Sequence, residues 1–219
     1  MKLTKQTLQF IENFQQINPS IKFLSGNVMR TCSPLKTIYA RANLDQEIEK
    51  DFSIYDLTKF MSALSLFNDP DIDLDKDSAT ITDGNKKIKY TYCSENTITI
   101  PSDKDVNLPS KDIKFQLTDE MLKSVTKASS VLKLPNIAVV GEDGKLFFKA
   151  FNVEDTTDNV YTLDIGETDQ EFVAVFNKDS FDKLIAQSYD VTISNKGLSE
   201  FKSSIVVYWV ALIKKESKF

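Results

Sequence analysis

The sequence predicts an α+β protein built from two similar domains, each combining antiparallel strands with two helices. Three observations lead to this prediction. Residues 1–17 and 114–133 share one layout, in which a short apolar strand meets a threonine and a helix-period run of apolar residues follows. Period-two alternation of apolar and polar residues, typical of half-buried strands, fills much of the remaining chain. A polar segment with two prolines, at 101–112, separates the two halves.

The composition fits an ordered globular protein and narrows the classes of function. The chain has 219 residues, a net charge of −5 and a hydrophobic fraction of 41%, enough for two domains of ordinary size. No apolar run is long enough for a membrane span, and the first residues lack the apolar core of a signal peptide. We therefore expect a cytosolic protein whose two cysteines, Cys32 and Cys93, are reduced thiols.

The chain contains no histidine, which excludes Ser-His and Cys-His nucleophile pairs and histidine-containing zinc sites. Enzymes that rely on Asp, Glu, Lys or Tyr stay open. Two segments look like ligand loops without meeting the requirements: residues 71–77 lack the Gly and Glu of a calcium loop, and residues 141–145 lack the spacing of a phosphate-binding loop. We therefore predict no catalytic residue, no metal and no cofactor.

The first half is expected to begin with a helix that Thr4 caps and Pro19 ends, and to contain a second helix capped by Asp56. Asp83-Gly84 is a strong hairpin signal, and a hairpin around Gly26 is expected to join the first two strands. The expected buried stripes are Leu8, Ile11, Phe14 and Ile17, and then Leu57, Phe60, Met61, Leu64 and Phe67. The expected strands are 21–24, 28–32, 38–44, 52–55, 72–74, 86–93 and 97–100.

The second half repeats this plan. Thr118 is expected to cap its long helix and Asn177 a shorter one, and the turn at Asp143-Gly144 joins two strands where the first half turns through Gly26. The expected buried stripes are Met121, Leu122, Val125, Ala128, Val131 and Leu132, and then Phe181, Leu184 and Ile185. The expected strands are 114–117, 137–140, 145–152, 160–165, 171–176, 191–194, 198–201 and 205–213. The matched order indicates an internal duplication, with domains at 1–101 and 113–219 and a linker at 102–112.

Four segments carry a resemblance to a known family: MKLTKQTL at the start, FSIYDLTKFMSALSLF at 52–67, GEDGKLFFKAFN at 141–152 and SSIVVYWVALIKKE at 203–216. The chain resembles the DNA polymerase sliding clamp, or processivity factor, of T-even-like tailed phages. The resemblance covers essentially the whole length. It implies the DNA-clamp fold, in which antiparallel sheets form the outer wall and helices line the interior of a homotrimeric ring.

The same resemblance implies the partners. They are duplex DNA, held topologically and without sequence preference, the replicative DNA polymerase, a separate clamp loader, and in late transcription a sigma-like factor and its coactivator. It places the protein in the cytoplasm of the infected bacterial host, with no membrane contact. Two alternatives of other classes stay open: a duplicated structural or virion protein, and a carboxylate-dependent hydrolase such as a glycosidase.

Helices that line a DNA hole should carry lysines and few acids on the faces turned away from the sheet. The free faces of the four expected helices fit this in part, although Lys and Ser are also common on any solvated helix. The negative net charge does not exclude the hypothesis, because a topological link needs only weak Lys–phosphate contacts. The predicted DNA-facing residues are Lys5, Lys59, Lys123, Lys127, Lys133, Lys178 and Lys183.

The resemblance also implies two protein contacts. The strand near 86–92 of one subunit would meet the strand near 159–165 of the next, with Tyr90 and Tyr92 against Tyr161, Leu163 and Ile165. The alternative is that these side chains pack within their own domains. A pocket for partner peptides would draw on Leu35, Ile38, Tyr39, Val106, Leu108 and Trp209, although Trp209 lies in an apolar strand that is also typical of a core.

Overall fold

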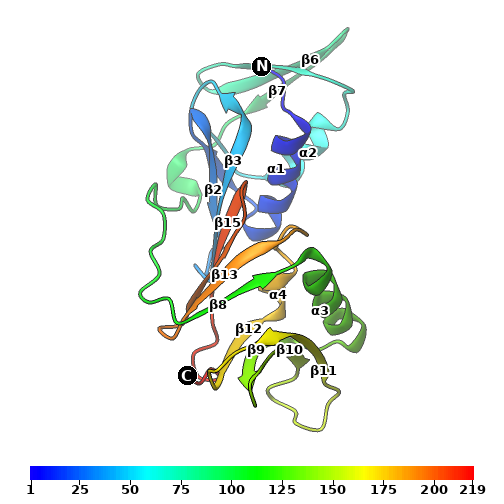
Figure 1. The fold of residues 1–219 in the computed structure, drawn as a ribbon. Coiled ribbons are helices and arrows are strands. Elements are labelled where there is room, and N and C mark those ends of the chain that lie inside the picture. Colours follow the sequence, from blue (N-terminus) through cyan, green and yellow to red (C-terminus); the bar gives the residue numbers. More distant parts are fainter. The chain divides into compact units, whose positions relative to one another are not determined.

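The computed structural model describes residues 1–219, which divide into two compact units, Met1–Asp105 and Val106–Phe219. The division falls within the segment predicted as the linker. Each unit combines helices with antiparallel strands (Figure 1), so the predicted α+β class is confirmed. No helix is long and apolar enough to cross a membrane.

The first unit contains α1 (Lys5–Ile17) and α2 (Leu57–Leu64), and both begin where the sequence predicts. The Thr4 side chain accepts a hydrogen bond from the amide of Thr7 at 3.1 Å, and the Asp56 carboxylate accepts one from the amide of Lys59 at 2.8 Å. These bonds satisfy amides that have no partner within a helix. Phe67 is buried, as predicted, although it follows the end of α2.

The strands of the first unit pair in three groups. β1 (Ile21–Phe23) pairs with β4 (Phe52–Ile54), and β2 (Gly26–Cys32) pairs with β3 (Ile38–Ile48). β5 (Asp71–Leu74), β6 (Ser78–Asp83) and β7 (Lys86–Thr91) form a meander. The turn at Asp83-Gly84 joins β6 to β7 as predicted.

Two predictions for this unit are wrong. The strand at 21–24 does not form a hairpin ladder with 28–32, because β1 gains a better apolar partner in β4, where the Phe23 and Phe52 rings stack at 4.5 Å. The predicted strand at 97–100 is absent. The chain forms a 3₁₀ turn at Glu95–Thr97, in which the Thr97 hydroxyl donates to the Ser94 carbonyl at 2.6 Å, a local bond that competes with strand pairing.

The second unit contains α3 (Asp119–Leu132) and α4 (Lys178–Phe181), capped by Thr118 and Asn177 as predicted. Its strands are β8 (Ile113–Leu117), β9 (Asn136–Glu142), β10 (Lys145–Phe151), β11 (Tyr161–Glu167), β12 (Phe172–Asn177), β13 (Tyr189–Ser194), β14 (Leu198–Lys202) and β15 (Val206–Ala211). They pair in the orders β11-β10-β9-β12 and β15-β14-β13-β8.

The pairing orders support the internal duplication. β10–β11 and β9–β12 in the second unit repeat β2–β3 and β1–β4 in the first, and each set is followed by a short helix and three more strands. The units differ in how their first two strands after the long helix meet. β9 and β10 form a full hairpin ladder across Asp143-Gly144, whereas the equivalent β1 and β2 have no ladder.

Two further predictions fail at the ends of helices. Val131 and Leu132 are 71% and 36% exposed, because Lys133 ends α3 in the left-handed conformation at φ 57° and turns Leu134 into the core instead. The Ser129 hydroxyl secures this turn by donating to the Leu134 carbonyl at 2.7 Å. α4 has only four residues, so Leu184 and Ile185 follow the helix, although Leu184 is still buried.

Candidate nucleic-acid interface and assembly edges

The exposed face of α3 carries two lysines one helical turn apart, Lys123 and Lys127. Lys123 forms an ion pair with Asp119 at 2.6 Å on the same helix, which partly neutralises its charge. Lys127 forms no ion pair. Both lysines, with Thr126 and Ser130, line a hollow of about 580 Å³ between α3 and the segment after α4. Lys127 is therefore the stronger candidate for a phosphate contact on this helix.

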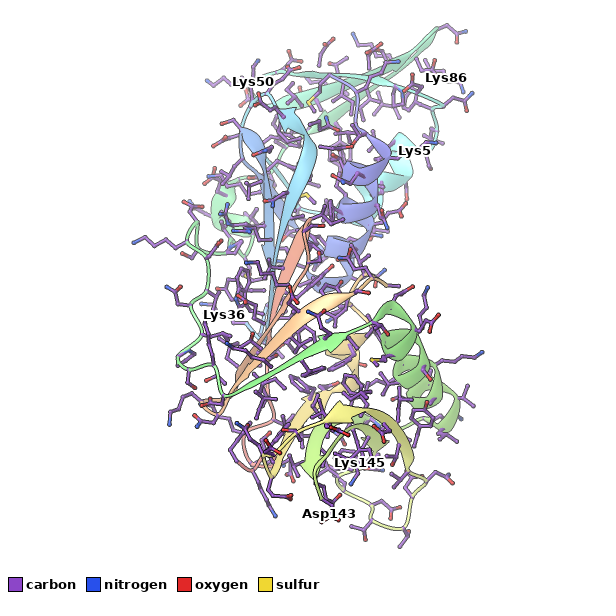
Figure 2. All side chains as sticks on the ribbon, viewed as in Figure 1. Lys5, Lys36, Lys50, Lys86, Asp143 and Lys145 are labelled. Atoms are coloured by element: carbon purple, nitrogen blue, oxygen red, sulfur yellow. The ribbon has the colours of Figure 1, made fainter.

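The exposed faces of α1 and α2 border a second hollow of about 570 Å³. Lys5 lies at the start of α1 and is exposed (Figure 2), and Lys59 is exposed on the first turn of α2. Glu12 and Asp69 also line this hollow, and Asp69 forms an ion pair with Lys2. The Ser62 and Ser65 hydroxyls donate to the carbonyls of Thr58 and Ser62, each at 2.8 Å.

The other predicted DNA-facing lysines differ in exposure and in ion pairing. Lys133 is exposed at the C-terminal end of α3. Lys178 is only 18% exposed in its side chain and forms an ion pair with Asp182. Lys183 is half-buried and lies beyond the end of α4. The exposed lysines are thus Lys5, Lys59, Lys123, Lys127 and Lys133.

In the sheets β5-β6-β7 and β11-β10-β9-β12, one edge strand has no backbone partner on its outer side; β2 and β8 are also edge strands. In the first unit this strand is β7, because Met1 exchanges hydrogen bonds with Ile72 and covers the other edge of that sheet. In the second unit it is β11, because Lys218 pairs with Val173 on the opposite edge. Unpaired strand edges are natural templates for association between chains.

The two open edges carry opposite charge. β7 bears Lys86, Lys87 and Lys89, all exposed, and Lys86 lies at the outer end of the hairpin (Figure 2). β11 bears Asp164 and Glu167, both exposed, although Asp164 already forms an ion pair with Lys145 of β10 at 2.9 Å. The predicted interface rests on the apolar residues of these strands, which do not reveal this difference in charge. The alternation of charged and apolar residues along each strand was the signal that would have found it.

The tyrosines of the β7 region pack within their own unit. The Tyr90 ring meets Phe60 edge-on at 5.1 Å, and its hydroxyl donates to the Asp56 carbonyl at 3.1 Å. The Tyr92 ring stacks on Phe52 at 5.2 Å, and burial raises the pKa of its phenol to about 12. Both tyrosines therefore contribute to packing within the first unit. What the open edge of β7 presents to solvent is chiefly its backbone and its lysines.

On β11, the predicted interface residues Tyr161, Leu163 and Ile165 are half-buried on one face of the strand. Tyr161 shares a hydrogen bond of 2.7 Å with the hydroxyl of Ser124. Val160, immediately before the strand, is 60% exposed.

The residues predicted for a peptide pocket belong to both units and differ in exposure. Leu35 is 85% exposed, whereas Ile38 is buried and Tyr39 is half-buried. Val106 and Leu108 are half-buried. Trp209 is only 5% exposed and donates its indole N–H to Glu200 at 3.0 Å, so it is mainly a core residue of the second unit.

Sequence analysis missed one cluster, which consists of Arg30, Arg41 and Asp105. Arg30 on β2 is the register partner of Arg41 on β3, and both guanidinium groups form ion pairs with Asp105. These two residues are the only arginines in the chain, a signal that would have drawn attention to them. No group of three or more acidic or cysteine side chains is arranged to hold a metal ion.

Comparisons with known proteins agree on one family. Residues 2–100 match the family model described as DNA polymerase processivity factor, and residues 114–214 match the model described as gp45 sliding clamp, C terminal. The sliding clamp of Vibrio phage KVP40 is 30% identical over 96% of this chain and 98% of its own length. The sliding clamp of Escherichia phage RB69 is 32% identical over 97% and 96%.

The fold agrees with these matches. The crystal structure of the proliferating cellular nuclear antigen from Entamoeba histolytica superposes with a TM-score of 0.69 at 16% identity, covering 98% of this chain and 95% of that one. The DNA-clamp fold predicted from the sequence is therefore confirmed. The similarity to the KVP40 and RB69 proteins extends over nearly the whole of each chain. This chain belongs to the phage sliding clamp family, the processivity factors of DNA polymerase.

Proposed function

We propose that three copies of this chain close into a ring around duplex DNA and tether the replicative DNA polymerase to it. The family provides processivity to a DNA polymerase, a function that needs no catalytic residue. Family membership also removes the grounds for the hydrolase and the virion-protein alternatives.

One observation supports the ring most directly: β7 and β11, an open edge strand in each unit, carry opposite charge, basic on β7 and acidic on β11. A β7 edge cannot pair with another β7 edge without placing like charges together, which is unfavourable. Pairing of β7 with β11 of the next copy is favourable and head-to-tail. Head-to-tail contacts form a ring when the rotation between copies closes. The family resemblance gives three as the number of copies.

In this ring the helices would face the duplex. The exposed lysines Lys5, Lys59, Lys123, Lys127 and Lys133 would supply mobile contacts to phosphates, and the ion-paired Lys178 and half-buried Lys183 would contribute less. Such contacts carry no sequence information, which suits a protein that must move along DNA.

For the partner peptides we propose a direct contact with exposed Leu35 and half-buried Tyr39 in the first unit, and with Val106 and Leu108 in the second. Ile38 and Trp209 are too buried to be contacted directly and would support these positions. The polymerase, a clamp loader and the late-transcription sigma-like factor with its coactivator are the proposed occupants.

Two measurements test the ring. Light scattering should give about three times the chain mass of 24.8 kDa. After loading onto nicked circular DNA, the protein should stay bound until the circle is linearised and then escape from the ends. A monomeric mass, or equal retention on circular and linear DNA, would refute the proposal.

A further inference from the structure

The two arginines of the chain face each other across adjacent strands. Arg30 on β2 lies opposite Arg41 on β3 in the antiparallel register. Like charges at directly opposed positions of a sheet are destabilising. Elsewhere the chain uses lysine for its positive charges, whereas this pair uses the side chain whose planar fork matches a carboxylate.

The arginines lie on the face of β2 and β3 that is turned away from the core. Their strand neighbours Met29, Thr31, Ala40 and Ala42 are buried, and α1 packs against these strands. Figure 1 shows α1 on one side of β2 and β3, and the chain that follows the 3₁₀ turn at Glu95–Thr97 on the other. Side chains alternate between faces along a strand, so Tyr39 shares the face of Arg41.

Asp105 is the only anion that the structure places at this pair, and it forms a hydrogen bond with only one of the two arginines. It accepts a hydrogen bond from Nη1 of Arg41, but its distance of 3.6 Å from Nη2 of Arg30 is too long for a hydrogen bond. The Nε atoms of both arginines are buried and donate no hydrogen bond. The cluster therefore keeps an excess positive charge and two unsatisfied donors, which are costly.

A carboxylate that approaches a guanidinium in the plane of the fork engages Nε and one Nη together, with more energy and better geometry than a single contact. We propose that Arg30 and Arg41 form a binding site for a carboxylate of an acidic partner peptide, and that Asp105 occupies this site in the free protein until the peptide displaces it. The inference rests on the proposed function only in taking the ligand to be a peptide of a protein that the clamp tethers.

The probe is a synthetic peptide, blocked at both ends, that contains two aspartates followed by phenylalanine and leucine. Its twin carries asparagines in place of the aspartates. Each arginine has one Nε–H group, so the arginine region of a ¹H–¹⁵N spectrum holds two signals. The aspartate peptide should shift both signals, and the asparagine peptide should shift neither.

Substitution of Asp105 and substitution of Arg41 should change the affinity for the aspartate peptide in opposite directions. Asp105→Asn removes the internal competitor and should tighten binding of the aspartate peptide about fivefold, the factor expected for loss of one surface ion pair. Arg41→Gln should abolish that binding. Arg41→Lys, which keeps the charge but loses the fork, should give intermediate binding and serves if Arg41→Gln does not fold. Lys104→Gln removes an exposed charge next to the site and should change binding less than about twofold.

A cluster that only fastened the segment around Asp105 would behave differently. Asp105→Asn and Arg41→Gln would then act in the same direction, and the aspartate and asparagine peptides would respond alike. Either result overturns the proposal. Light scattering and DNA retention on the same variants separate this site from the ring: a variant that loses peptide binding but keeps the trimer tests the site alone, and a wild type without a trimer refutes the ring alone.

Discussion

Among single residues, the lysines of α3 show how a neighbouring acid changes the expected role of a side chain. Lys123 and Lys127 are both exposed and one turn apart, so the sequence gives them equal weight. The structure separates them, because Asp119 pairs with Lys123 alone. A lysine whose charge is already compensated gains less from a phosphate.

Lys127→Glu should therefore weaken the hold on DNA more than Lys123→Glu does. The expected loss for Lys127→Glu is about fivefold in the lifetime of the loaded protein on circular DNA, corresponding to about 1 kcal/mol for an exposed charge contact. Lys114→Glu makes the same charge change at an exposed position of β8 and is the control. Equal lifetimes for Lys127→Glu and the control would make the α3 face an ordinary solvated surface.

Tyr92 gives a prediction for pH. Its phenol ionises near pH 10 in an unfolded chain, but burial raises the pKa to about 12 in the folded protein. The folded state therefore holds the phenol proton more tightly than the unfolded state does. The contribution of this proton to the free energy of unfolding is fully present below pH 10 and is lost as the pH rises from 10 to 12.

Tyr92→Phe should consequently lose less stability than the wild type between pH 9 and pH 11.5, measured as the shift in the urea midpoint. Tyr55→Phe, which removes an exposed hydroxyl, is the matched control. Tyr189 and Tyr208, whose pKa values burial also raises, are present in all three proteins and cancel in the comparison. The same shift in wild type and Tyr92→Phe would contradict the assignment.

At the level of elements, the proposed ring depends on the open edges of β7 and β11. Lys87→Glu with Lys89→Glu should dissociate the trimer, because β7 would then present acids to the acidic β11. Asp164→Lys with Glu167→Lys should do the same from the other side.

Combining all four substitutions in one chain should restore the trimer, because a head-to-tail contact with both charges reversed is again complementary. Analytical ultracentrifugation of the three variants at one concentration measures this. A combined variant no more associated than either double variant would show that these charges do not face each other.

The starts of the helices, many of the strands and the hairpins at Asp83-Gly84 and Asp143-Gly144 could be predicted from the sequence, whereas pairing between distant strands and the ends of elements could not. The caps at Thr4, Asp56, Thr118 and Asn177 are local bonds that three or four residues specify. The choice of β4 over β2 as the partner of β1 depends on Phe52, far along the chain. The exposure of Val131 depends on the left-handed turn at Lys133, a conformation unusual for lysine.

In the candidate site, too, local features could be predicted from the sequence and long-range contacts could not. Exposed lysines on free helix faces follow from helical periodicity, whereas the low exposure of Lys178 comes with its ion pair to Asp182, the residue that follows the four-residue α4. The Arg30–Asp105–Arg41 cluster depends on the register of β2 and β3 and on a contact 64 residues apart in the chain, which periodicity does not specify.

For the whole molecule, the net charge of −5 separates two ways of holding DNA. A protein that binds by electrostatic affinity through six to ten phosphate contacts loses about 10³–10⁵ in affinity between 50 and 200 mM salt. A closed ring does not need that affinity, because the duplex cannot leave sideways.

Retention on closed circular DNA should therefore change less than about tenfold over the same salt range, whereas linear DNA should be released throughout it. Gel filtration of loaded complexes at each salt concentration measures both. A loss of about a thousandfold on circular and linear DNA alike would identify ordinary electrostatic binding.

The hydroxyl groups on the helices have a consequence for movement. Ser62, Ser65 and Thr126 each give their only proton to a carbonyl of their own helix, at 2.8 Å. A phosphate oxygen only accepts hydrogen bonds, so these hydroxyls have nothing left to donate to it. In the proposed ring, these three hydroxyls would then add no friction along the duplex. The energy barriers between successive positions on the DNA would be low, which favours fast one-dimensional diffusion.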